Sequence, residues 1–111
     1  MTLDEYFATG PPHERPVFDA VMAHLATLGP VHVEPVSVGI FIKRDGSFME
    51  LRPMERWVAL SFPLRRRAQH RTIVRKVMSY HGRYYHIANV ARPEDLDDAL
   101  LGLITESYAD A

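Results

Sequence analysis

The hydrophobic pattern of the chain changes period at Gly29-Pro30, and this change constrains the fold more than any other feature of the sequence. Before it, Val17, Val21 and Leu25 recur four residues apart, which is the spacing of one face of an α-helix. After it come short runs rich in β-branched and aromatic residues, separated by proline, glycine and aspartate. Such runs are typical of strands and turns. The pattern therefore predicts an α+β fold, with helices first and a sheet afterwards.

Two helices are expected before the change of period. Thr2-Leu3-Asp4-Glu5 matches a capping box and predicts a short helix that ends at about Ala8. The apolar stripe predicts a second helix from about Pro12 to Leu28, since Gly29-Pro30 is a strong stop signal.

The rest of the chain predicts an antiparallel sheet of five to six strands. A β-meander is expected across residues 31–63, with a hairpin turn at Asp45-Gly46. Residues 72–80 fit a helix as well as a bulged strand. We predict the strand, because His81-Gly82-Arg83 resembles a turn and residues 84–90 are a convincing partner strand.

A C-terminal helix is expected to begin at Pro93 and to pack on the sheet. Leu96, Leu100, Leu103 and Ile104 lie along one side of it. With 111 residues of ordinary globular composition, we expect a single domain over residues 1–111.

Composition excludes several classes of protein. The chain has no cysteine, so thiolate nucleophiles and cysteine zinc sites are excluded. The first residues carry Asp4 and Glu5 where a signal peptide would be basic, and no apolar run approaches the roughly 20 residues of a membrane span. We therefore expect a cytoplasmic protein without membrane contact, as a monomer or a homodimer.

Charge is strongly segregated although the net charge is only −1. Nine of the thirteen Lys and Arg residues fall between Arg56 and Arg92, where no Asp or Glu occurs. We call part of this segment the basic block: Arg65, Arg66, Arg67, Arg71, Arg75, Lys76 and Arg83, with Tyr84, Tyr85 and His86. Guanidinium groups hold phosphates and aromatic rings stack on bases, so the block predicts an acidic partner: an acidic ligand, nucleic acid or an acidic protein surface.

Three other interpretations compete with anion binding. The block can be a solvated face whose charges are balanced by acidic residues near the last helix: Glu94, Asp95, Asp97 and Asp98. A ligand pocket or weak hydrolase site under the sheet would use Trp57, Glu50 and Phe62, with His86 as a further residue to test. Self-association through an exposed strand edge is the third.

No enzyme motif accompanies these residues. The six histidines show no zinc spacing, and nucleophile elbows, phosphate-binding loops and dinucleotide glycine patterns are missing. We therefore lean toward a non-enzymatic accessory or binding domain, with no metal and no cofactor.

Several landmarks occur in a familiar order. They are Leu28-Gly29-Pro30, Val31 with Val33, Ile40 with Lys43-Arg44, the run Gly82 to His86, and the run Arg92 to Gly102. In this order they resemble a bacterial family, domain of unknown function 5655, over nearly the whole chain. The resemblance implies a small α+β domain with no established activity.

The chain departs from this family at two places. Members often carry a Lys-Ser-Gln-like stretch where this chain has Ser37, Val38 and Gly39. A site that used that lysine would be lost here. The last helix of relatives tends to start Ser-Pro, whereas Arg92 offers no capping oxygen.

Overall fold

A computed structural model describes residues 1–111 and combines three α-helices with one six-stranded antiparallel sheet. The elements in chain order are α1 (Leu3–Phe7), α2 (Glu14–Ala26), β1 (His32–Val36), β2 (Gly39–Lys43), β3 (Ser47–Pro53), β4 (Val58–Leu64), β5 (Met78–Tyr80), β6 (Arg83–Val90), the 3-10 turn η1 (Pro93–Asp95) and α3 (Asp98–Asp110). The strand order across the sheet is β1-β2-β3-β4-β6-β5. The α+β class and the arrangement of helices before and after the sheet are thus confirmed.

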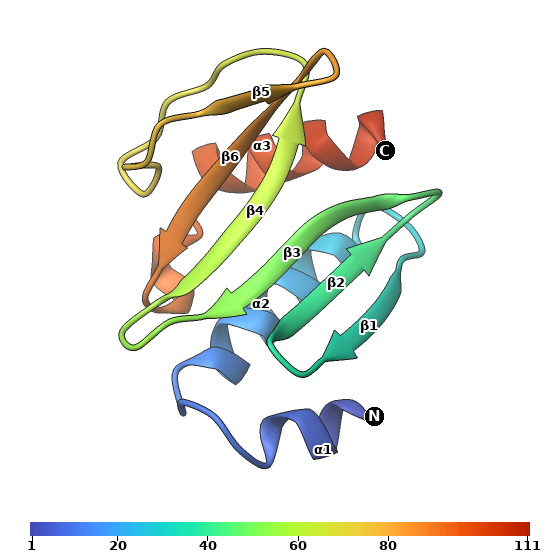
Figure 1. Ribbon diagram of the computed structural model, residues 1–111, viewed down its shortest axis with the longest axis vertical. Coiled ribbons are helices and arrows are strands. Elements are labelled where there is room, and N and C mark those ends of the chain that lie inside the picture. Colours follow the sequence, from blue (N-terminus) through green and yellow to red (C-terminus); the bar gives the residue numbers. More distant parts are fainter.

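The two long helices lie on the same face of the sheet, and the opposite face carries no helix (Figure 1). Val17, Val21 and Leu25 of α2 are fully buried, as the four-residue spacing predicts. They belong to one core of 22 residues with alternate side chains of the strands, such as Ile40 and Leu60. The other side chains of the strands form the face without helices, which we call the open face.

The N-terminal region folds as its capping signals predict. Thr2 and Glu5 form a complete capping box: the Glu5 amide donates to the Thr2 hydroxyl at 3.1 Å, and the Thr2 amide donates to the Glu5 carboxylate at 2.8 Å. Helix α2 is shorter at both ends than predicted. The predicted strands and the turn at Asp45-Gly46 are present with slightly different ends.

The long hairpin predicted for residues 72–90 is only partly correct. Strand β5 holds three residues, and residues 65–77 follow an irregular path along the edge of β6. One backbone–backbone bond ties this segment to β6, from the Asn89 backbone amide to the Thr72 carbonyl at 2.9 Å. The turn itself forms as expected, because His81 and Gly82 both adopt a positive φ, 51° and 76°.

The last helix begins later than predicted. Pro93 starts a 3-10 turn instead, and α3 begins at Asp98. The side chain of Asp97 caps α3 by accepting from the Leu100 amide at 2.9 Å, whereas Arg92 makes no capping bond. A helix starts where a side chain can accept from its first free N–H groups, and here that residue is Asp97.

Candidate functional site

Much of the basic block is neutralised by η1 and α3. Arg66 pairs with Glu106 through two bonds of 2.9 and 3.0 Å, Arg71 lies 3.3 Å from Asp95, and the Arg65 guanidinium lies 3.6 Å from the carboxylate of Asp110. These arginines are more than half exposed, so their ion pairs contribute little to folding. Their positive charge is nevertheless matched by a nearby carboxylate.

The balancing carboxylates differ in part from the expected ones. Asp95 is one of them, and Asp97 accepts from the ring of His70 at 2.8 Å. Glu94 and Asp98 make no ion pair, and Glu106 and Asp110 take their place. The helical period of α3 explains the change, since Glu106 and Asp110 are four residues apart and share one face.

A second group of cations has no carboxylate partner. Arg75 and Lys76 are exposed and form no ion pair. Arg67 donates to the Val77 carbonyl at 3.2 Å and lies 4.9 Å from the centroid of the Tyr84 ring. Arg83 donates to the Asp110 carbonyl at 3.2 Å. The uncompensated charge of the block is therefore concentrated in the segment before β5.

His86 and Phe62 lie in the core, away from any surface site. His86 is 0 % exposed: its Nε2 accepts from the Ala68 amide at 2.9 Å, and its Nδ1 donates to the Tyr84 carbonyl at 2.9 Å. Its ring stacks on the equally buried ring of Phe62. Burial lowers the pKa of His86, and the bond to the Tyr84 carbonyl opposes this shift. Neither residue can touch a partner at the surface, because alternation along each strand turns both toward the helices.

Trp57 and Glu50, by contrast, come together on the open face. With Arg52, Met54, Ala59, Ser61, Arg75, Ile87 and Asn89 they line a hollow of about 270 Å³, which we call the Trp57 hollow. Strand register produces this grouping, since Glu50 is opposite Ser61, which is opposite Ile87, while Ala59 is opposite Asn89. The Trp57 hollow thus lies on the open face. The sequence had instead suggested a site under the sheet, between the sheet and the helices.

The comparisons with known proteins identify the family. A family described as "Domain of unknown function (DUF5655)" matches residues 3–111. The chain belongs to this DUF5655 family. No curated protein and no solved structure gives a significant match. The resemblance predicted from the order of landmarks is confirmed, and the family description assigns no activity.

The floor of the Trp57 hollow in this DUF5655 domain offers polar groups to a ligand. Glu50 accepts from Arg52 at 3.3 Å, while the Ser61 hydroxyl and the side-chain amide of Asn89 have no hydrogen-bond partner in the protein. Every fully enclosed polar side-chain atom has a partner, so these two groups remain open to solvent. Trp57 is 37 % exposed, which leaves its ring accessible beside them.

The edge of the sheet beside the hollow is also incompletely paired. The Asn89 amide points to the Thr72 side of β6, so by alternation the N–H and C=O of Ile87 point the same way. Neither group has a backbone partner, because residues 73–77 form no ladder with β6. Arg75 of the same segment lines the hollow.

A second hollow of about 170 Å³ continues from the first. It shares Glu50 and Ser61 and adds Phe41 and Tyr85, so two more aromatic side chains lie along the open face. It opens where β3 and β4 diverge: their pairing covers only Glu50–Pro53 with Val58–Ser61 (Figure 1). The open face of the DUF5655 domain therefore carries a connected, partly aromatic trough.

The structure does not bring the ten residues of the basic block together at one site. Arg65, Arg66 and Arg71 face the carboxylates of η1 and α3, His86 is in the core, and Arg75 reaches the Trp57 hollow. Sequence reasoning missed Arg52, Ser61 and Asn89, whose only signal is their alternation with core residues of the same strands. No group of three His, Asp or Glu side chains is placed to hold a metal ion, and no helix has the length and apolar content needed to cross a bilayer.

Proposed function

We propose that the domain binds a nucleotide unit, free or within a single strand, in the Trp57 hollow of the open face. The observation that carries the proposal is the position of Arg75: a cation without a carboxylate partner, at the rim of a hollow that also holds an accessible tryptophan. A nucleotide combines a planar ring with a phosphate, and these two groups match the two sides of the hollow.

The charges orient the ligand within the hollow. Glu50 lies on the floor and would repel a phosphate, whereas Arg75 lies at the rim and attracts it. Lys76, the next residue in the chain, is exposed and adds to the positive charge of this segment. The ring would then stack on Trp57. Its polar edge would meet the unpaired groups of Ser61 and Asn89, which can each donate and accept hydrogen bonds.

Trp57 also provides the assay, because it is the only tryptophan of the chain. A ring that stacks on it should quench its fluorescence, so quenching can be followed during titration with adenosine monophosphate. Ribose 5-phosphate, which lacks the ring, and adenosine, which lacks the phosphate, should bind at least tenfold more weakly. A short single-stranded oligonucleotide distinguishes the source: equal affinity for it and for the mononucleotide indicates a one-unit site.

Two matched double variants test the role of the rim. Arg75→Gln with Lys76→Gln removes two unpaired cations, and Arg65→Gln with Arg66→Gln removes two cations that are paired with α3. Both variants remove two positive charges, so they differ only in where the charges lie. Only the first variant should lower the affinity and reduce the dependence of the affinity on salt. Trp57→Ala lacks the fluorophore, so its binding is measured by isothermal titration calorimetry beside the wild type. Binding should weaken by roughly 5- to 150-fold, as expected for lost stacking. The proposal fails if the wild-type domain does not bind at low salt, or if both double variants lose affinity equally.

A further inference from the structure

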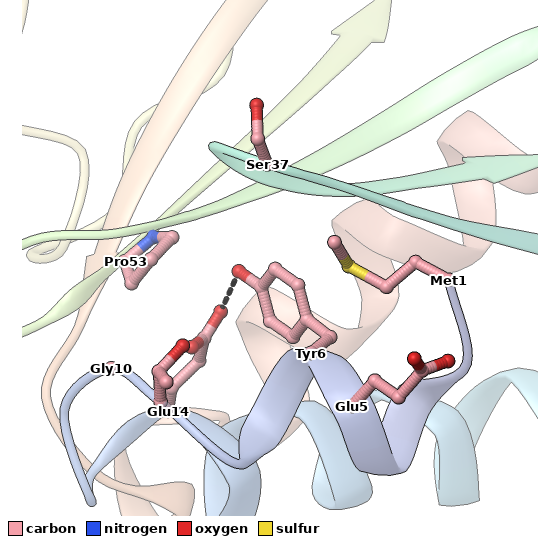
Figure 2. Close-up of a pocket in the computed structure, with 8 residues that line it drawn as sticks. Met1, Glu5, Tyr6, Gly10, Glu14, Ser37 and Pro53 are labelled. Carbon is pink, nitrogen blue, oxygen red and sulfur yellow. Dashed lines mark hydrogen bonds between the residues drawn. The ribbon is translucent and has the colours of Figure 1, made fainter.

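The N-terminal region holds a cavity built around a buried carboxyl group. Figure 2 shows Tyr6 of α1 and Glu14 at the start of α2 meeting below Ser37 and Pro53 of the sheet region. The lining residues Met1, Glu5, Thr9 and Gly10 complete the cavity, whose volume is about 130 Å³. One water needs roughly 10–15 Å³ of such volume, so the cavity can hold a small molecular group.

Glu14 is 1 % exposed, and only one of its carboxylate oxygens has a partner. The Tyr6 hydroxyl donates to Oε2. Oε1 accepts no hydrogen bond. Every polar side-chain atom that is fully enclosed has a partner, so Oε1 is not fully enclosed and must face the space of the cavity. A buried carboxylate with an unfilled acceptor is costly unless something donates to it.

The backbone keeps this oxygen uncovered. Gly10 has a φ of +98°, a conformation that residues with a side chain rarely adopt, and a Cβ there would lie 3.6 Å from Oε1. Nearby cations do not enter the cavity as partners: Arg15 pairs with Asp4 at 3.4 Å, and the His13 ring contacts the Trp57 carbonyl at 3.3 Å. The bond from the Thr2 amide and the charge of the N-terminal ammonium lower the pKa of Glu5, so its charge is already balanced. Glu14 is the cavity carboxylate without an ion-pair partner.

We infer that the cavity binds the primary ammonium group of a small amine, with Glu14 Oε1 as its main acceptor. An ammonium group presents three N–H donors and one positive charge. One donor matches the free oxygen of Glu14, and the positive charge matches the charge of the Glu14 carboxylate. Two carboxylates without a third acidic or histidine ligand are a poor set for a divalent metal, and no larger group of such ligands is present.

The test is a titration of the full chain with methylammonium chloride, followed by the backbone amide signals of Gly10 and Glu14 in NMR spectra. Tetramethylammonium chloride is the matched control, since it has the same charge and no N–H donor. We expect saturable shifts with methylammonium only. Shifts that do not saturate, or that tetramethylammonium reproduces, overturn the inference.

Two variants assign the acceptor. Glu14→Gln keeps the shape and removes the charge, so it should weaken methylammonium binding at least tenfold. Tyr6→Phe frees the second oxygen and should bind at least as tightly as the wild type. Wild-type affinity in Glu14→Gln overturns the inference. If that variant does not fold, the pH profile decides. Burial raises the pKa of Glu14 above its usual 4.5, so binding must weaken on acidification while the pH is still above 4.5. The rim variant of Arg75 and Lys76 should bind methylammonium normally, which separates this site from the Trp57 hollow.

Discussion

Replacing His86 by leucine should destabilise the domain through the loss of two hydrogen bonds to buried or half-buried backbone. The Ala68 amide, on a residue that is 8 % exposed, would lose its only acceptor, and the Tyr84 carbonyl would lose a donor. An unpaired buried N–H costs about 1–3 kcal/mol and an ordinary hydrogen bond contributes about 0.5–1.5 kcal/mol. We therefore expect His86→Leu to lower the free energy of unfolding by about 2–4 kcal/mol.

This is a large fraction of the roughly 5–15 kcal/mol that stabilises a typical domain. Urea unfolding at pH 7.5, followed by far-UV circular dichroism, measures the change. Leucine fills a volume similar to that of histidine, so a cavity contributes little to the result. A loss below about 0.5 kcal/mol would refute the argument that this ring holds residues 65–77 against β6.

The pH dependence of the same variant provides a second readout. Burial lowers the pKa of His86 below the usual 6.5, so the unfolded chain takes up its proton at a higher pH than the folded chain does. The contribution of neutral His86 is therefore complete above pH 6.5 and declines as the pH falls toward the folded pKa. Over that window the wild-type domain should lose up to about 1.4 kcal/mol per pH unit more than His86→Leu. The control is His81→Asn at the exposed turn, where asparagine tolerates a positive φ; its pH slope should match the wild type, and an unchanged slope in His86→Leu would contradict the assignment.

Two further substitutions test the fold. Gly39→Ala should lower the free energy of unfolding by about 1–3 kcal/mol in urea, because its Cβ would lie 2.5 Å from the Leu51 carbonyl oxygen; a neutral effect would show that β2 and β3 can separate without cost. Asp97→Ala should lower the melting temperature at pH 7, because it removes the cap on the Leu100 amide and the contact with His70. These bonds lower the pKa of Asp97, so its stabilisation is lost as the pH falls through that pKa, and calorimetry at pH 3 should show a smaller difference from the wild type.

The sequence predicts those parts of the fold that local chemistry decides. The capping box at Thr2 and the apolar spacing of α2 fix helices within a few residues of chain, and both appear as predicted. The predicted start of α3 was wrong because the sequence offers two possible starts. Pro93 begins only a 3-10 turn, and the helix begins after Asp97, whose side chain accepts from its first turn. The path of residues 65–77 could not be predicted from the sequence. It depends on a bond between Ala68 and His86, which are 18 residues apart, and no local pattern indicates that bond.

The candidate site shows the same division. Alternation along β6 indicates that Tyr85 and His86 face opposite ways, but it does not say which face the helices cover. Which arginines are neutralised depends on Glu106 and Asp110, about 40 residues away in the chain. The buried Glu14 left one signal: it lies three and four residues before Val17 and Phe18, on the apolar side of α2.

The order of strands has a consequence for how the chain reaches its native state. Strands β1 to β4 pair with their neighbours in sequence through short turns, so they can form early as a meander. Pairing of β4 with β6 instead encloses residues 65–82, and this larger loop must be closed before the two strands gain their contacts. The last helix also packs against β4, and it follows β6 in the chain, so we expect it to dock after that closure. The transition state for folding should therefore contain the meander, with the β6 pairing as the late and slower step.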